Sequence, residues 1–260
     1  MAMDARLAEV KRLFEKPEWY LSGRTYHVRV RMDVVRDFLK DTEFNSILDI
    51  GCGDGSISLP LLTPARRLTL LDMSDAMLDI ARSRVPSELS AAVKTASGDF
   101  MQAGFDTHSY DLVICLGVLA YVDSPKPLIE KLLSILKPGG KLIVECSDRS
   151  HFMSRLARGY DRARNIFAKP KFRPAAHSAN AIVAMFRGAG FQLEAEYRYC
   201  APIRVMRKLF SQGFHYQMIC AVHGKAASNR MWWLGNECIF YFRKTLKKTE
   251  TKSGFESNGG

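Results

Sequence analysis

The sequence lacks any apolar run that approaches the ~18 residues of a transmembrane helix. Its start, MAMDARLAEVKRLFEKPEW, is charged throughout and contains no apolar signal core. From these two absences we expect a cytoplasmic protein. The 260 residues contain no internal repeat, and a chain of this length suits one large domain or one domain with substantial insertions.

Paired cysteines are also missing. No two of the six cysteines form a CxxC pair; they are Cys52, Cys115, Cys146, Cys200, Cys220 and Cys238. Disulfide frameworks and zinc sites depend on cysteines at regular, clustered spacings. We therefore expect reduced, mostly buried thiols and no metal site.

Acidic residues are scarce in two internal segments and in the tail. Residues 148–174 hold eight Lys and Arg against two Asp, and residues 200–235 hold five Lys and Arg and no acid. Residues 243–260 add five Lys and Arg against two Glu. Because the whole chain carries a formal charge of +11, the remainder is slightly acidic. The basic character therefore belongs to these segments and not to the whole surface.

Apolar runs that are typical of strands alternate with helical patterns along most of the chain. The expected strands are residues 46–51, 68–73, 92–97, 110–117, 141–147, 191–199 and 236–244. The expected helices are residues 4–16, 27–40, 77–85, 127–140 and 179–191. This alternation predicts an α/β fold: a doubly wound, mostly parallel seven-stranded sheet with helices on both faces.

The regular pattern breaks twice, at residues 148–176 and 200–234. We expect residues 1–45 to form an N-terminal helical cap. Residues 46–243 would form one domain in which the two breaks are helical insertions that act as a substrate lid. Residues 244–260 are polar and are expected to be disordered.

The stretch ILDIGCGDGS, residues 47–56, follows the first strand of the domain and precedes an expected helix. In doubly wound sheets this turn is where nucleotides bind. Dinucleotide enzymes use the spacing GxGxxG against a pyrophosphate, but here the spacing is GxGxG, flanked by Asp49 and Asp54. A carboxylate near a pyrophosphate costs electrostatic energy, whereas one near a cation gains it. The stretch therefore favours an adenosine ligand that carries a positive charge and no phosphate.

Five motifs occur together in the order in which they occur in a known family. They are ILDIGCGDG, LLDMS, SGDF, YDLVICLGVLAYVDSP and LKPGGKLIV. Over roughly residues 20–147 the sequence resembles the class I S-adenosylmethionine-dependent methyltransferases. The resemblance implies a Rossmann-like sheet whose last strand is antiparallel, S-adenosyl-L-methionine as the methyl donor, and S-adenosyl-L-homocysteine as the product.

The resemblance also implies roles for individual residues in the first two motifs. The methionine part of the cofactor would lie beside Asp49, Gly51, Cys52 and Gly53. Asp72, 21 residues after Gly51, would bond both ribose hydroxyls, and Met73 would lie against the adenine.

The remaining motifs would complete the cofactor site. By the same resemblance, the adenine edge would lie at Gly98, Asp99 and Phe100. The Asp99 carboxylate would accept from the adenine amino group, and the backbone of Phe100 would contact the ring. Leu116 and Gly117 would close over the methionine end.

Members of this family often cover the cofactor with a tyrosine and an arginine that precede the first strand. By that resemblance, Tyr20 would cap the site and Arg31 would pair bidentately with the cofactor carboxylate. A solvated helix start explains Arg31 equally well.

The sequence does not single out a catalytic base. Relatives often place an aromatic or histidine side chain near the methyl group at the position of Tyr121, although a packing aromatic explains Tyr121 equally well. His151 lies just past the fifth expected strand, where relatives build substrate lids. Tyr121 and His151 are thus the candidate catalytic residues, and nothing in the sequence ranks His215 or His223.

The two basic insertions leave the methyl acceptor open. We expect a small, anionic biosynthetic metabolite, methylated on an oxygen or nitrogen atom and held by the arginines. The competing acceptors are a nucleic acid or a protein, and a lipid-like molecule with membrane contact through residues 200–234. Nucleic acid is disfavoured because no RNA-binding module or stacking signature is present. The last alternatives are a solvated charged face and a non-catalytic cofactor-binding module, and the sequence does not predict the oligomeric state.

Overall fold

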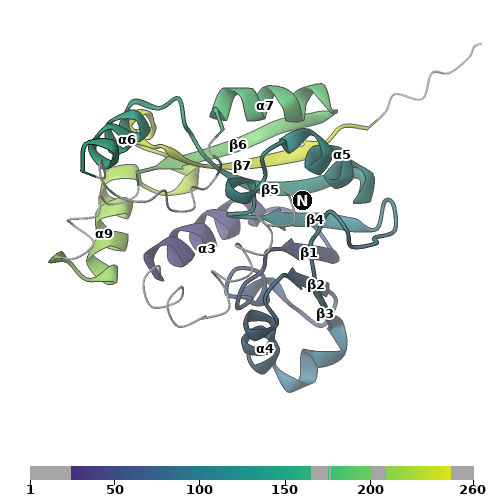
Figure 1. Ribbon diagram of the computed structural model, residues 1–260. Coiled ribbons are helices and arrows are strands. Elements are labelled where there is room, and N and C mark those ends of the chain that lie inside the picture. Colours follow the sequence, from purple (N-terminus) through teal and green to yellow (C-terminus); the bar gives the residue numbers. More distant parts are fainter. Residues whose placement is uncertain (1–24, 165–174, 176, 201–208, 247–260) are drawn as a thin grey trace, which may run out of the picture.

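The computed structural model describes residues 25–164, 175, 177–200 and 209–246, with the backbone alone at Ala157 and residues 160–164 (Figure 1). The helix expected at residues 4–16, Tyr20, and the tail beyond residue 246 lie outside the described residues. In the described part of the chain, no helix is both long enough and apolar enough to cross a membrane.

A single seven-stranded sheet organises the molecule, in the spatial order β3-β2-β1-β4-β5-β7-β6. The strands are β1 Ser46–Ile50, β2 Arg67–Asp72, β3 Val93–Ser97, β4 Tyr110–Cys115, β5 Leu136–Ser147, β6 Phe191–Tyr199 and β7 Glu237–Lys244. Strand β7 is antiparallel to both of its neighbours, and the pairs among β1 to β5 are parallel. The expected doubly wound, mostly parallel sheet with an antiparallel last strand is confirmed.

Helices cover both faces of the sheet. They are α3 Thr25–Leu39, α4 Asp75–Ser83, α5 Pro125–Ile135, α6 Phe152–Arg164, α7 Ala179–Gly188 and α9 Gln212–His223. One hydrophobic cluster joins the sheet to α5 and α7, and a second joins it to α3, α4 and α9. Adjacent residues of one strand divide between the two clusters, as Ile47 and Leu48 do, because side chains alternate across a sheet.

Two expected helices differ from the structure, and proline explains both differences. The glycine-rich stretch is followed only by turns and the short 3-10 helix η1 Leu59–Leu61, because Pro60 and Pro64 prevent an α-helix from continuing. The helix expected to reach residue 140 ends at Ile135. Residues 136–140, which include Pro138, extend β5 instead.

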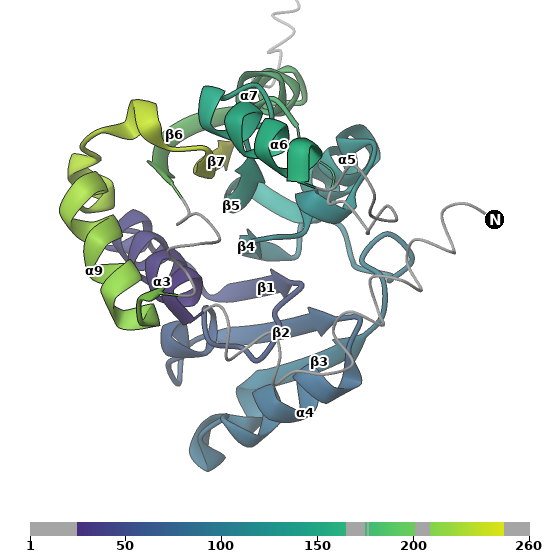
Figure 2. The same ribbon diagram turned by 60° about the vertical axis from the view of Figure 1, so that its left-hand side comes forward.

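Both insertions leave the sheet at the same edge. Ser147 and Tyr199, the last residues of β5 and β6, lie opposite Glu237, the first residue of β7. Parallel strands share their carboxyl-terminal edge, so α6 and α9 begin on the side where β1, β2 and β4 also end. Figures 1 and 2 show α6 and α9 at this end of the sheet.

In the segment before β7, the backbone at Gly235 lies close to the backbone at the end of β6. This contact gives a testable prediction. A β-carbon added to Gly235 would lie 2.5 Å from the backbone nitrogen of Tyr199. We expect Gly235→Ala to lower the free energy of unfolding by about 1–3 kcal/mol, because backbone must shift.

The matched control is Gly188→Ala, in α7, where an added β-carbon meets nothing within 4 Å. This control should leave stability unchanged or raise it by up to about 1 kcal/mol. Chemical denaturation measures both variants, and equal stability of the two would contradict the close approach.

Candidate ligand site at the carboxyl edge of the sheet

The glycine-rich loop bends back over the end of β2. The N–H groups of Gly51 and Cys52 donate to the carbonyl of Leu71, over 2.8 and 3.1 Å. Gly53 has a φ of +54°, in the left-handed region that favours glycine, and a β-carbon built on it meets nothing within 4 Å. The loop thus presents bare backbone to open space at Gly53.

Asp72 ends β2 directly beside this loop. One of its carboxylate oxygens accepts from the Gly53 N–H (2.8 Å), and the other accepts from the Ser74 N–H (2.9 Å). Burial raises the pKa of Asp72, although these backbone hydrogen bonds counteract the effect. The two bonds orient the carboxylate and leave each oxygen a further lone pair for a ligand hydroxyl.

Asp49 lies beneath the loop and is only 3% exposed. Its carboxylate accepts from the Ser58 hydroxyl over 2.6 Å. Burial raises the pKa of Asp49 to about 7; the Ser58 hydrogen bond counteracts part of this rise, and the carboxylates of Asp72 and Asp54 add to it. A nearby cation would favour the ionised form, so Asp49 suits a positively charged ligand.

The position of Asp54 beside the glycines suggested a cationic ligand as its partner, but in the structure its partner is an arginine. It forms an ion pair with Arg84, and its second oxygen accepts from the Ser56 N–H over 3.1 Å. Arg84 therefore balances the charge of Asp54, whereas the hydrogen-bond donors at Asp49 and Asp72 are the neutral Ser58 hydroxyl and backbone N–H groups.

The segment after β3 brings Gly98, Asp99 and Phe100 to the same edge. Gly98 donates to the Asp72 carbonyl (2.9 Å), and a β-carbon built on it also meets open space. The Asp99 carboxylate accepts from the Met101 N–H, and the Phe100 ring is buried. These positions are compatible with the predicted adenine edge, which stays a prediction.

The end of β4 carries Leu116, which is buried, and Gly117. A β-carbon built on Gly117 would lie 3.3 Å from Nη2 of Arg31. The structure thus brings Arg31, from α3, to the expected methionine end of the site. In this position its guanidinium binds both oxygens of Glu145 on β5. Pairing with a cofactor carboxylate stays a prediction for Arg31.

A polar network extends from Glu145, and sequence reasoning missed it. The Tyr199 hydroxyl donates to Glu145 (3.2 Å), and Tyr199 lies 3.0 Å from Nδ1 of His27. The other ring nitrogen of His27 lies 2.7 Å from the Tyr26 hydroxyl. These side chains come from α3, β5 and β6, so no local sequence pattern could have revealed the network.

The two candidate catalytic residues lie at this edge but have structural contacts. Tyr121 is half-buried in the 3-10 helix η3 Leu119–Tyr121, which follows β4. Both ring nitrogens of His151 are engaged, one with the Trp233 carbonyl (2.8 Å) and the other with the Met153 N–H (3.2 Å). His151 thus holds the start of α6 against the second insertion, and its catalytic role stays a prediction.

His215, on the first turn of α9, is fully buried. Among the described residues, neither of its ring nitrogens has a hydrogen-bond partner. Its ring packs edge-on against Tyr26, 5.7 Å between centroids, and therefore lies next to the His27 network. Burying an imidazole without partners costs free energy, so this side chain is suited to contact a polar ligand.

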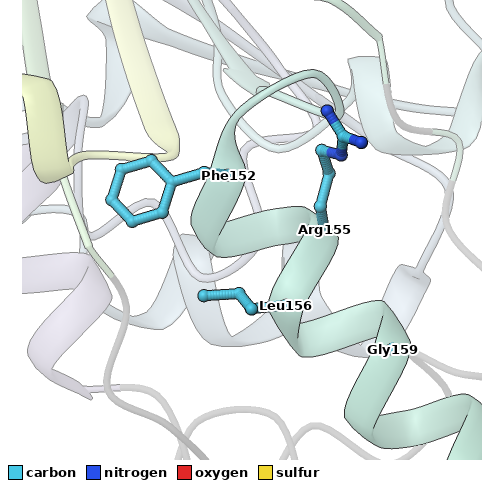
Figure 3. Close-up of a pocket in the computed structure, with 4 residues that line it drawn as sticks. All are labelled: Phe152, Arg155, Leu156 and Gly159. Carbon is cyan, nitrogen blue, oxygen red and sulfur yellow. The ribbon is translucent and has the colours of Figure 1, made fainter.

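A shallow, open cavity of about 570 Å³ lies along the surface of α6 and is lined by Phe152, Arg155, Leu156 and Gly159 (Figure 3). These residues are spaced i, i+3, i+4 and i+7, so they share one face of the helix. Figure 3 shows Phe152 and Leu156 pointing to the same side of α6, with Arg155 directed away from them. The cavity can take an apolar group and places one cation at its border.

Part of the chain is similar in sequence to known methyltransferases. Residues 48–144 match the family model of the methyltransferase domain. A ubiquinone biosynthesis O-methyltransferase of Coxiella burnetii is 28% identical over 104 residues, which cover 40% of this chain and 44% of that protein. The protein of the same name from Alkalilimnicola ehrlichii is 30% identical over 122 residues, 46% of this chain and 49% of that one. The chain thus spans about half the length of the curated relatives it matches.

Solved structures extend the likeness beyond that domain. An S-adenosylmethionine-dependent methyltransferase of Thermotoga maritima covers 92% of this chain with a TM-score of 0.65 and 19% identity; the whole of its own chain is matched. A magnesium protoporphyrin IX methyltransferase of Synechocystis, solved with S-adenosylhomocysteine, covers 92% of this chain and all of its own, with a TM-score of 0.64 and 17% identity. These likenesses show the fold.

Replacing the buried carboxyl is predicted to stabilise the protein in a pH-dependent way. The pKa of Asp49 rises from 3.8 to about 7 on folding, so the folded state binds this proton more tightly. Burying the charged form costs up to about 4 kcal/mol above pH 7, and this cost is absent below about pH 4. Asp49→Asn should therefore raise the melting temperature at pH 8 by several degrees.

This gain should shrink steadily as the pH falls toward 4, and thermal unfolding across that range measures it. The control is Asp79→Asn, on the exposed surface of α4, which should show no such trend. A difference between Asp49→Asn and the native protein that is constant from pH 4 to pH 8 would contradict the buried carboxyl.

Proposed function

We propose that this protein transfers a methyl group from S-adenosylmethionine to a small metabolite, because residues 48–144 match the family model of the methyltransferase domain. One observation carries the proposal: open glycine backbone at Gly53 lies between the oriented carboxylate of Asp72 and the buried carboxyl of Asp49. This combination suits a ligand with vicinal hydroxyls and a positive charge, and it would repel a pyrophosphate.

The chain's residues fit such a cofactor from end to end. Asp72 would hold the ribose hydroxyls, and the backbone from Gly51 to Gly53 would follow the methionine part. The space beside Gly98 is open, so the adenine would lie there, near Asp99 and Phe100. Arg31 reaches the opposite end beside Gly117, where it could exchange part of its contact with Glu145 for a carboxylate.

The bound cofactor would supply an electrophilic methyl group on a sulfonium, ready for in-line displacement. The protein then has to orient the acceptor and exclude water. The two insertions would perform this task; the His151–Trp233 hydrogen bond, which joins α6 to the segment before β7 at the ligand edge, supports this assignment. Asp49, which lies beneath the glycine-rich loop, would stabilise the positive charge of the cofactor before the methyl group is transferred.

For the acceptor, we propose an oxygen atom of a small molecule that has an apolar part and an acidic group. Phe152 and Leu156 would contact the apolar part in the α6 cavity, and Arg155 would pair with the acid. The names of the curated relatives, which specify O-methylation, support oxygen over nitrogen. A hydroxyl acceptor also requires a group that takes its proton.

His215 is the better candidate for that proton acceptor than His151. Both ring nitrogens of His151 are used in local contacts, whereas those of His215 are buried without partners next to Tyr26. The Tyr26–His27–Tyr199–Glu145 network continues from this point and could hold the imidazole in place.

Cofactor binding can be tested at Asp72. Calorimetry with S-adenosylmethionine and with S-adenosylhomocysteine should show binding to the native protein. Asp72→Ala loses two charge-assisted hydrogen bonds worth ~1.5–3 kcal/mol each, so affinity should fall by more than about 100-fold. Asp79→Ala, an exposed carboxylate on α4, serves as the control and should bind normally. Equal affinity of the two variants would remove Asp72 from the ribose.

Acceptor chemistry can be tested at His215. With labelled cofactor, a panel of acidic hydroxylated metabolites should identify an acceptor. His215→Gln should then lower kcat by about 10²–10⁴-fold, leave S-adenosylhomocysteine binding unchanged, and remove one limb from the pH profile of kcat. His108→Gln, at an exposed turn far from the ligand edge, is the matched control. A full pH profile retained by His215→Gln would exclude His215 as the base.

A further inference from the structure

Large apolar side chains are exposed mainly on the two insertions. Ten such residues are exposed in the described part of the chain, and eight of them belong to α6 or to residues 209–234. The eight are Phe152, Leu156, Leu209, Phe210, Phe214, Met231, Trp232 and Trp233. Single exposed apolar residues are normal on a protein surface, but a concentration on two adjoining segments marks an interaction site.

Direct contacts join the aromatic residues of the first insertion to those of the second. His151 bonds to the carbonyl of Trp233, and its ring lies 4.6 Å from the ring of Phe152. The side chain of Asn236 donates to the hydroxyl of Ser154 in the first turn of α6. These contacts hold together the two segments that carry Phe152, Leu156, Trp232 and Trp233, and we call these four exposed residues the insertion surface.

Two tryptophans dominate this surface. Trp232 and Trp233 are 55% and 54% exposed, although they lie in the ordered 3-10 helix η5 Trp232–Leu234. The guanidinium of Arg198 lies 5.9 Å from the ring of Trp232, which helps to hold that ring in place. Such rings combine an apolar body with one polar N–H, the property that favours the boundary between lipid headgroups and acyl chains.

The two segments that carry the insertion surface contain basic residues and no acidic ones. Residues 149–159 and 209–235 contain no Asp or Glu, whereas they contain Arg149, Arg155, Arg158, Lys225 and Arg230. Arg158 is exposed and donates to the carbonyl of Arg149, so two arginines stand together beside the apolar residues of α6. This combination of exposed aromatics with cations complements an anionic headgroup layer.

We propose that the insertion surface docks on an anionic lipid bilayer, with Trp232, Trp233, Phe152 and Leu156 at the headgroup boundary. The cavity along α6 is lined by Phe152 and Leu156, so docking would place it against the lipid. An amphipathic acceptor could then enter from the bilayer. Docking itself requires no methyl transfer, so it stands or fails independently of the proposed function.

Vesicle binding tests the proposal directly. The full chain is sedimented with vesicles of phosphatidylcholine alone and of phosphatidylcholine mixed with phosphatidylglycerol. We expect binding to the anionic vesicles, a blue shift of tryptophan emission, and weaker binding as salt is added, because exposed charges are screened. No binding to anionic vesicles at low salt would overturn the proposal.

Two variants separate the apolar contribution from the charge. Trp232→Ala/Trp233→Ala should reduce vesicle partitioning by at least about tenfold, and so should Arg158→Glu/Arg230→Glu. The matched controls lie at the opposite edge of the sheet. They are Leu246→Ala, which removes an exposed apolar side chain, and Arg67→Glu/Lys94→Glu, which makes the same change in net charge. Both controls should partition like the native protein.

Three other results would overturn docking of the insertion surface on lipid. Vesicle binding that both charge-reversal variants reduce equally and that the tryptophan variant retains would indicate attraction by net charge alone. Salt-dependent binding to single-stranded RNA that Arg158→Glu/Arg230→Glu reduces and Arg67→Glu/Lys94→Glu retains, without binding to anionic vesicles, would assign the surface to nucleic acid. A dimer in light scattering that the tryptophan variant converts to a monomer would make the surface an interface between two copies of the chain.

Discussion

The backbone link between the glycine-rich loop and the end of β2 is the constraint on which the ligand edge depends. Gly51 and Cys52 donate to the Leu71 carbonyl, and Gly53 donates to the Asp72 carboxylate. Because β1 and β2 are parallel, these bonds fold the loop across the neighbouring strand end instead of letting it run straight into a helix. The same bonds orient Asp72 and cover Asp49, so one set of contacts shapes the ligand surface and encloses its charge.

Enclosing that charge costs stability. Within the described part of the chain Asp49 has no ion-pair partner; its carboxylate accepts from the Ser58 hydroxyl, and burial raises its pKa to about 7. Elsewhere the fold neutralises such groups: Arg84 pairs with Asp54, and Arg31 pairs with Glu145. A structural carboxylate would be expected to have a similar partner. The contrast supports a ligand that supplies the missing positive charge when it binds.

The donor and acceptor halves of the site are built in different ways. The proposed donor half consists of strand ends and short loops, and backbone hydrogen bonds hold these segments in place. The proposed acceptor half comes from two insertions that contact each other through a few side chains, such as His151 and Asn236. Exposed aromatic residues and an excess of basic over acidic residues distinguish these insertions from the rest of the described surface. Such a division allows the acceptor to differ among proteins that keep one donor site.

The sequence by itself determined the sheet and most of its strand boundaries to within a few residues, because alternating strands and helices follow from local periodicity; β5 begins five residues earlier than expected. The resemblance to the methyltransferases, and not periodicity, placed Asp72 in one site with Asp49 and Gly53. The prediction of a helix after the glycine loop was wrong, because it passed over Pro60 and Pro64. Only the tertiary structure decided that Arg84 neutralises Asp54, that Glu145 holds Arg31, and that His215 is buried beside Tyr26. These partners lie far apart in the chain, and their pairing depends on how α3, α9 and the strands pack, which no local pattern records.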